Sequence, residues 1–282
     1  MIARAKNSVI AMVLLGGLTA CGETPTSEMS AEISEQDQLK ADTNAILGKL
    51  TQMEQNRGEA IGKPDFASIA DVNQKKTAFF DYLRPAVEHE NRRVEKERQF
   101  LVQLQKLIQS GDKLESEKVF YAKKLGKNYS YDLASDIVTE SWLEEMLNRV
   151  DVLPESLVLS QAANESGWGT SRFAVEGNNY FGQWCYRKGC GLIPASRKDD
   201  ATHEVAVFDS AYLSVQAYFM NVNRNRAYQD LRDIRTAQRQ AGNTIEGSKL
   251  AEGLIQYSER GHAYIEEIQA MIKHNNQYWR QG

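Results

Sequence analysis

The carboxylate of Glu165 follows an apolar stretch of sequence and precedes a bend rich in glycine, an unusual place for an ionisable side chain. The run ESLVLSQAANESGWG predicts a helix over residues 155–166, with Glu165 in its last turn. Unpaired carbonyl groups at a helix C-terminus disfavour a nearby negative charge, and burial against Trp168 and other apolar groups would also raise the pKa of the carboxyl group. A glutamate held protonated near neutral pH can act as a general acid and release a sugar leaving group.

The residues after Glu165 are of types that bind sugars. Gly167 and Gly169 keep bulk away from the space in front of the carboxylate. Amides and aromatic faces suit hydrogen bonding to sugar hydroxyls and stacking on sugar rings. The side chains that could do so are Trp168, Asn178, Asn179, Tyr180, Phe181 and Trp184. The alternative is that Glu165 is a solvated residue at a helix end and that the aromatic residues belong to a core.

The elements that must position these residues are mostly helical. Val87, Val94 and Leu101 recur every seven residues and predict one apolar face of a long helix. Further helical patterns occupy residues 115–126, 132–150 and 212–276. The alternation in HEVAVF, near the end of the segment 178–208, predicts a small β-hairpin or extended lobe. The expected fold is therefore mainly α, of the α+β kind.

The segment QAANESGWGTSRFAVEGNNYFG resembles, without gaps, the signature of the glucosaminidase domain, glycoside hydrolase family 73. The wider sequence is similar to the Bax protein subgroup of that family over residues 64–276, through FFDYLRP, RVDVLPESLVLSQAANESGWG, GQWCYRKGCGL, HEVAVF and YSERGHAYIEEI. The resemblance implies a lysozyme-like helical domain with a small β lobe flanking a cleft. It also implies cleavage of the β-1,4 bond between N-acetylglucosamine and N-acetylmuramic acid, with Glu165 as the catalytic acid.

A second carboxylate is the usual partner of such an acid. The family assigns this kind of role to an acidic residue of the β lobe, and SRKDDATHEVAVF offers Asp199, Asp200 and Glu204 there. We expect Glu204, because it begins an alternating strand and would have a fixed direction, whereas the two aspartates are typical of a turn. Two alternatives are that Glu204 is an exposed strand residue and that the N-acetyl group of the substrate takes this role.

The segment YSERGHAY resembles the C-terminal motif of the family that supplies an active-site tyrosine. It offers Tyr257 first and Tyr264 second, and a tyrosine hydroxyl could orient the acetamido group or water. At helical spacing both could instead be core residues. Arg232, Arg235 and Arg239 share one face of a predicted helix, where a solvated basic face is a simpler interpretation than a site for anionic peptides.

Cys185 and Cys190 enclose the short loop YRKG. In an oxidising compartment a disulfide could close this loop, if the geometry permits. The alternative is a pair of reduced thiols or half of a metal site, but no paired motif supports zinc. We therefore predict a disulfide, and we expect neither a metal nor a cofactor.

The N-terminus has the pattern of an export signal. Arg4 and Lys6 precede an apolar run over residues 9–18, and LTAC resembles the lipobox of bacterial lipoproteins, in which Cys21 would be acylated. Gly22 favours the outer membrane, facing the periplasm, and the alternative is an ordinary secretory signal. The predicted organisation is a signal peptide at 1–20, a flexible tether at 21–62, a helical N-terminal region at 63–135 and a glucosaminidase domain at 136–282.

The composition narrows the range of partners. Charged residues make up 26% of the chain and the net charge is −4, so nucleic-acid binding is disfavoured. We expect a monomer that binds peptidoglycan glycan strands and reaches a membrane only through its lipid. Two other hypotheses are a lytic transglycosylase, which would leave anhydro-muramic ends, and a non-catalytic glycan-binding lipoprotein.

Overall fold

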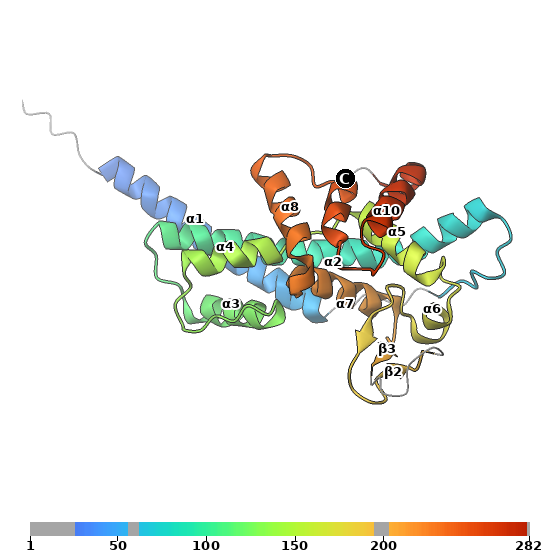
Figure 1. Cartoon of the computed structure of the whole chain (residues 1–282). Coiled ribbons are helices and arrows are strands. Elements are labelled where there is room, and N and C mark those ends of the chain that lie inside the picture. The colour runs from blue at the N-terminus through green and yellow to red at the C-terminus, as the bar shows by residue number, and fades with distance from the viewer. Residues whose placement is uncertain (1–25, 56–61, 195–202, 281–282) are drawn as a thin grey trace, which may run out of the picture.

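The structure, a computed structural model, describes residues 26–55, 62–194 and 203–280 of the 282-residue chain (Figure 1). The first helices are α1 (Thr26–Gln55), α2 (Val72–Gln109), α3 (Ser116–Asn128), α4 (Glu140–Arg149), α5 (Glu155–Ser166) and α6 (Arg172–Gly177). Three short strands follow, β1 (Trp184–Cys185), β2 (Gly191–Leu192) and β3 (Glu204–Ala206). The chain continues through α7 (Ala211–Arg224), η1 (Arg226–Tyr228), α8 (Gln229–Gln240), α9 (Gly247–Leu250), η2 (Ala251–Leu254), α10 (His262–His274) and η3 (Asn276–Tyr278). The predicted mainly α fold with a small β lobe is confirmed.

The long helix α2 runs through the middle of the molecule (Figure 1). It begins at a cap, where the Asp71 carboxylate accepts a hydrogen bond from the backbone N–H of Gln74 at 2.8 Å. The predicted apolar face is the buried one, with Val87, Val94 and Leu101 at most 1% exposed. This helix packs against α1, α4, α5 and α7. It therefore provides the surface on which the rest of the core is built.

The C-terminal part of α1 packs along α2, which differs from the flexible tether predicted for residues 21–62. Thr43, Leu47 and Leu50 are buried. Their spacing of four and then three residues puts them on one helix face. Lys118 of α3 also donates a hydrogen bond to the side chain of Asn44 at 2.8 Å. This buried face is short, but it is enough to dock α1 on α2.

Helix α5 is enclosed on nearly every side, as its composition predicts. All the residues from 157 to 163 are buried. Gly167 ends the helix in the left-handed conformation, with φ of 55°, where a residue without a Cβ is favoured. Helix α5 packs against α2, α9 and α10, so Glu165 in its last turn is held by the rigid core.

The β lobe is a three-stranded antiparallel sheet in the order β1–β3–β2. Trp184 pairs with Val205 and Cys185 with Glu204, so the predicted alternating segment HEVAVF supplies the central strand. The lobe lies on one side of the helical body, next to α6 (Figure 1). The loop between α6 and β1 brings Gly182 next to Glu165 at the end of α5.

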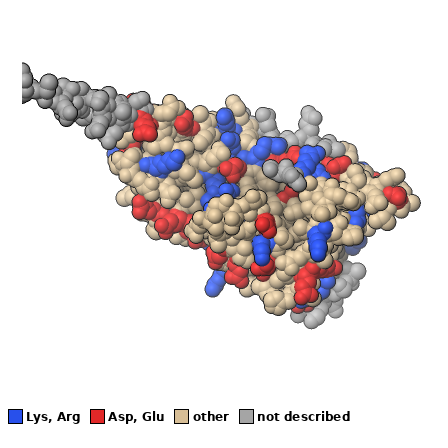
Figure 2. Space-filling view, turned by 90° about the horizontal axis from the view of Figure 1, so that it is seen from above, with Lys and Arg blue, Asp and Glu red and all other residues tan. Residues whose placement is uncertain are grey.

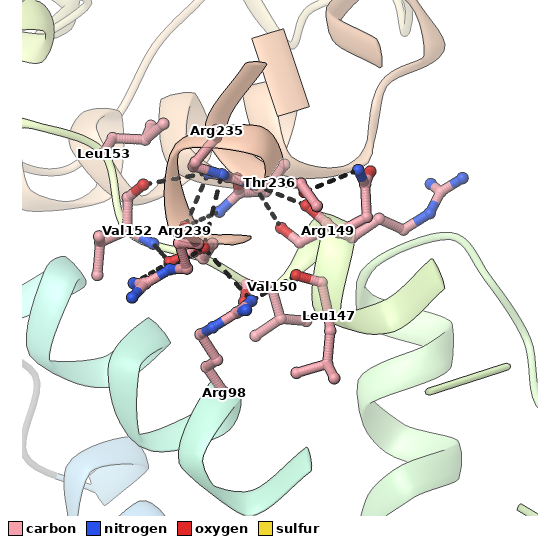
Figure 3. A network of polar contacts seen from close by, with 12 residues as sticks. Arg98, Leu147, Arg149, Val150, Val152, Leu153, Arg235, Thr236 and Arg239 are labelled. Carbon is pink, nitrogen blue, oxygen red and sulfur yellow. Dashed lines mark hydrogen bonds and ion pairs between the residues drawn. The ribbon is translucent and has the colours of Figure 1, made fainter. Parts of the chain in front are cut away.

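Two of the three arginines of α8 lie in the interior, so the prediction of a solvated basic face is wrong. Arg232 and Arg235 are fully buried. Arg235 donates from Nη1 to the carbonyl oxygens of Asp151 and Val152, at 3.0 and 3.1 Å, and Arg239 pairs with the Asp151 carboxylate (Figure 3). A guanidinium presents five donors, so it can satisfy several carbonyl groups of the turn between α4 and α5 at once. Arg232 and Arg235 therefore have no access to an anionic peptide, and the partly exposed Arg239 is already paired with the Asp151 carboxylate.

The surface of the described residues carries charges of both signs. Figure 2 shows them interspersed over one face, in keeping with the net charge of −4. Within the described ranges no helix is long and apolar enough to cross a membrane. The predicted signal peptide and Cys21 lie outside those ranges, as do Asp199 and Asp200.

Candidate active site

Glu165 lies at the end of a chain of hydrogen bonds that passes through the core. The hydroxyl of Tyr264 on α10 donates to Glu165 Oε1 at 2.8 Å, and Gln161 Nε2 donates to the Tyr264 oxygen at 3.0 Å. The hydroxyl of Tyr218 on α7 donates in turn to Gln161 Oε1. Because Gln161 and Glu165 are four residues apart on α5, they share one helix face. Three helices therefore fix the direction of this carboxyl group.

Burial raises the pKa of Glu165 above its ordinary value of 4.5. The hydrogen bond from Tyr264 and the positive charge of Arg260 act in the opposite direction, because both stabilise the carboxylate. Burial is the larger effect. The rings of Tyr257 and Tyr264 stack on each other beside Glu165, with centroids 5.2 Å apart, and help to keep water from it. The site therefore shifts this carboxyl group toward its protonated form.

A cavity of about 770 Å³ opens in front of Glu165. Aromatic side chains line it, and these are Phe181, Trp184, Tyr186, Phe208, Tyr218, Tyr228 and Tyr257. Side-chain amides also line it, from Gln183, Asn221, Asn225 and Gln256. This combination of apolar faces and uncharged hydrogen-bonding groups fits a carbohydrate.

Gly182 keeps the space next to Glu165 open. Its backbone has φ of 64°, a left-handed conformation that favours glycine. A Cβ added at this position would lie 3.8 Å from Glu165 Oε2. The second carboxyl oxygen of Glu165 therefore faces the cavity, while Oε1 faces Tyr264.

Three of the predicted site residues line this cavity together with Glu165, namely Phe181, Trp184 and Tyr257. Phe181 stacks on Tyr218 with ring centroids 4.1 Å apart, and its carbonyl oxygen accepts a hydrogen bond from the Tyr257 hydroxyl at 3.0 Å. Trp184 is 53% exposed and stacks on His203. Its indole therefore forms an aromatic face at the rim of the cavity.

Trp168 and Tyr180 do not line the cavity, and for these two the core interpretation holds. The ring of Trp168 packs against Phe79 and Phe80 of α2, with centroid distances of 5.7 and 5.3 Å. Tyr180 is fully buried and packs against Phe79 and Tyr82. The stacked rings beside Glu165 are those of Tyr257 and Tyr264 instead, which lie far from it in sequence.

Asn178 and Asn179 shape the loop that carries Phe181 and Trp184. Asn178 ends α6 in a left-handed conformation, and its side chain donates to the Phe208 carbonyl at 2.9 Å. Asn179 is buried and donates to two carbonyl groups of the lobe, while its Oδ1 accepts from the backbone N–H of Gln183 at 3.0 Å. Neither amide reaches the cavity, so their role here is to position the loop.

Glu204 points into the β lobe rather than into the cavity. It is 4% exposed, and its two oxygens accept hydrogen bonds from the backbone N–H groups of Gly189 and Gly191 at 2.9 and 2.8 Å. The structure does not bring this carboxylate together with Glu165. The strand position did predict a fixed direction, but that direction is toward the loop between Cys185 and Cys190.

The structure joins Cys185 and Cys190 in a disulfide, with their Cα atoms 6.2 Å apart. Both sulfur atoms lie within 4.8 Å of a Glu204 carboxylate oxygen, a spacing that thiolates would need to share a metal with it. Because the sulfur atoms are bonded to each other, they are not thiolate ligands. The bridge and Glu204 together hold the loop whose start carries Trp184 and Tyr186 at the cavity.

Several residues of the site carry little signal in the sequence. Gln161 could be found from its spacing, since it lies one helical turn before Glu165. Tyr218, Asn221 and Arg224 come from α7, more than 50 residues further along the chain, and nothing near Glu165 indicates them. Their contribution becomes visible only once α7 is packed against α5 and the lobe.

Comparison with known proteins is consistent with this geometry. Residues 140–277 match the model of the glucosaminidase family, described as mannosyl-glycoprotein endo-beta-N-acetylglucosaminidase, and this range includes Glu165 and every residue that lines its cavity. Protein bax of Escherichia coli (strain K12) is 30% identical over 220 residues, which is 78% of this chain and 77% of that protein. No solved structure matches the chain.

Proposed function

Because this chain belongs to the glucosaminidase family, we propose that it is a peptidoglycan hydrolase with Glu165 as its general acid. In this proposal it is an endo-β-N-acetylglucosaminidase, which cuts the β-1,4 bond between N-acetylglucosamine and N-acetylmuramic acid. The observation that carries the proposal is the half-buried carboxyl group of Glu165, with its raised pKa, at the wall of a cavity lined by aromatic rings and amides.

The hydrogen bonds of Glu165 indicate which oxygen would deliver the proton. Oε1 accepts from Tyr264, so a proton on the neutral acid belongs on Oε2, the oxygen beside Gly182. In the proposed reaction this proton passes to the glycosidic oxygen as its bond to the anomeric carbon of N-acetylglucosamine breaks. Water supplies the hydroxyl of the new reducing end, and its remaining proton restores Glu165.

The second catalytic role is proposed for the substrate itself. Glu165 is the one carboxylate among the described residues that line the cavity, and backbone amides already occupy both oxygens of Glu204. The acetamido oxygen of N-acetylglucosamine can attack the anomeric carbon, and water can then open the cyclic intermediate. This route gives overall retention of configuration at that carbon.

Digestion of purified sacculi tests the proposal. The wild-type protein is expected to release fragments that end in reducing N-acetylglucosamine. Glu165→Gln should lower the rate at least about 100-fold, because it removes the proton donor while keeping the shape of the side chain. Glu259→Gln is the matched control, since Glu259 is exposed and lies outside the cavity lining.

The products separate the competing hypotheses. Anhydro-muramic ends would identify a lytic transglycosylase, whose product lacks the added water. Equal rates for wild type and Glu165→Gln, or no cleavage by either, would contradict the assignment of Glu165. In the same digest, retained configuration of the first product supports assistance by the acetamido group. Inversion would require a separate base, for which Asp199 and Asp200 are the nearest sequence choices.

A further inference from the structure

A second cavity, of about 750 Å³, adjoins the one in front of Glu165. The two cavities share three lining residues, Phe208, Ala217 and Arg224, so they lie next to each other along α7. The far wall of the second cavity comes from Met53, Arg93, Glu97, Lys124 and Asn128. All five belong to α1, α2 and α3, which precede the part of the chain that matches the family model. The N-terminal helices thus add a compartment to the family's cleft.

Most of the buried charge in this second cavity is internally paired. Arg93 contacts the carboxylates of Glu90 and Glu97 at 2.8 and 2.6 Å. Tyr129 and Tyr212 donate further hydrogen bonds to these two carboxylates. This network forms a polar floor whose charges are already matched.

Arg224 is different, because it is exposed and stands where the two cavities meet. Its guanidinium donates one long hydrogen bond, of 3.4 Å, to the Asn128 carbonyl. Among the described residues no carboxylate forms an ion pair with it. A guanidinium has five donors and binds carboxylates through two of them at once. The junction therefore offers a positively charged group to whatever extends from the first cavity into the second.

We propose that the second cavity binds the acidic stem peptide of a glycan strand held at Glu165, with Arg224 pairing with a peptide carboxylate. This inference rests on the proposed function, which places a peptidoglycan strand in the first cavity. N-acetylmuramic acid units carry a short peptide with free carboxylates as a side branch. A branch leaving the strand next to the cleavage point needs its own compartment, and a cation at the entrance complements its charge. The enzyme would then prefer peptide-bearing strands to bare glycan.

Binding to soluble strands tests the inference without requiring turnover. The Glu165→Gln protein is titrated with uncross-linked strands that carry stem peptides, and with the same strands after an amidase has removed the peptides. Adding Arg224→Gln should raise Kd for peptide-bearing strands about tenfold, equivalent to ~1.4 kcal/mol, and should raise Kd for bare strands less than about twofold. Arg224→Glu should weaken the binding of peptide-bearing strands further, because it reverses the charge.

Arg226→Gln is the matched control, since Arg226 is exposed two residues away and lines neither cavity. It should leave both Kd values within about twofold of the Arg226 protein. Added salt should weaken binding of peptide-bearing strands when Arg224 is present, and less when it is replaced. Equal losses on the two strands, or no preference for peptide-bearing strands with Arg224 intact, would overturn the inference. Because neither outcome depends on cleavage, failure of this inference is distinguishable from failure of the proposed hydrolysis.

Discussion

Two opposing effects act on the carboxyl group of Glu165. Burial disfavours the charged form, whereas the hydroxyl of Tyr264 stabilises it through a hydrogen bond to Oε1. The same hydroxyl also accepts from Gln161, so it can offer its own proton only to Glu165. Tyr264 thus determines both the orientation of the acid and how far its pKa is raised.

Tyr264→Phe is expected to raise the pKa of Glu165 further, since it removes a donor that favours the carboxylate. A general acid works in its protonated form, which is present below its pKa. The alkaline limb of kcat/KM against pH should therefore move to higher pH, measured on a soluble glycan fragment. Stability should fall by about 1–3 kcal/mol in denaturant unfolding, because Gln161 Nε2 loses its acceptor in the core.

Tyr257→Phe is the control for the shift of the alkaline limb. Its hydroxyl donates to the Phe181 carbonyl and makes no hydrogen bond to Glu165. The alkaline limb should therefore stay in place even if the rate changes. An alkaline limb that is unchanged or shifted to lower pH in Tyr264→Phe would contradict the role given to this hydrogen bond.

At the scale of elements, the disulfide loop connects the β lobe to the cavity wall. The bridge closes the chain directly after Trp184, and Glu204 accepts hydrogen bonds from the backbone N–H groups of Gly189, inside this loop, and Gly191, just after it. A carboxylate that accepts backbone N–H groups makes stronger hydrogen bonds than a neutral acceptor. The loop therefore has two independent constraints, one covalent and one electrostatic.

Replacing both cysteines, as in Cys185→Ser with Cys190→Ser, is expected to lower stability by about 2 kcal/mol, the amount expected for a loop this short. Thermal unfolding with and without reductant measures this effect. Reductant should lower the melting temperature of the wild type and leave that of the double variant unchanged. Equal melting of the wild type in both conditions would count against a stabilising bridge.

The sequence predicts elements well where a single face or a single stretch decides them. Helix α5 was expected at 155–166 and is found there, because its apolar run and its terminal glycine are local signals. The apolar face of α2 is predictable for the same reason, because the spacing of residues within one segment determines it. The arginines of α8 show the limit, since their spacing indicates a shared face but not whether that face meets water or unpaired carbonyl groups.

The candidate site follows the same rule. Glu165 and the loop with Phe181 and Trp184 stand in one motif, so their grouping is predictable from the sequence. Trp168 lies in the same motif yet packs on α2, because the left-handed turn after α5 directs it away from the cavity. Tyr218 needs the packing of a distant helix and has no local signal.

At the scale of the whole molecule, the family domain shares its core with the N-terminal helices. Phe79, Phe80 and Val87 of α2 are buried, and the two phenylalanines contact Trp168. The predicted boundary between residues 135 and 136 therefore divides the sequence but not the core. Each large apolar side chain contributes about 1.5–3 kcal/mol when buried, and net stability is only about 5–15 kcal/mol.

A fragment of residues 136–282 is accordingly expected not to unfold cooperatively, because it lacks the face of α2 on which α5 and α7 pack. A fragment of residues 63–282 keeps that face and should unfold in one transition. Circular dichroism during urea unfolding compares the two fragments. A cooperative transition for the shorter fragment would show that α2 is dispensable for the core.

The order of donors behind Glu165 has a consequence for successive cuts. Tyr218, Gln161 and Tyr264 all donate toward the carboxylate, and the amide of Gln161 does not pass a proton onward. Among the described residues, this chain of hydrogen bonds therefore offers no path for a proton back to the deprotonated Glu165. The proton that restores Glu165 has to come from the solvent side, past Gly182. Protons and the sugar chain therefore use the same entrance.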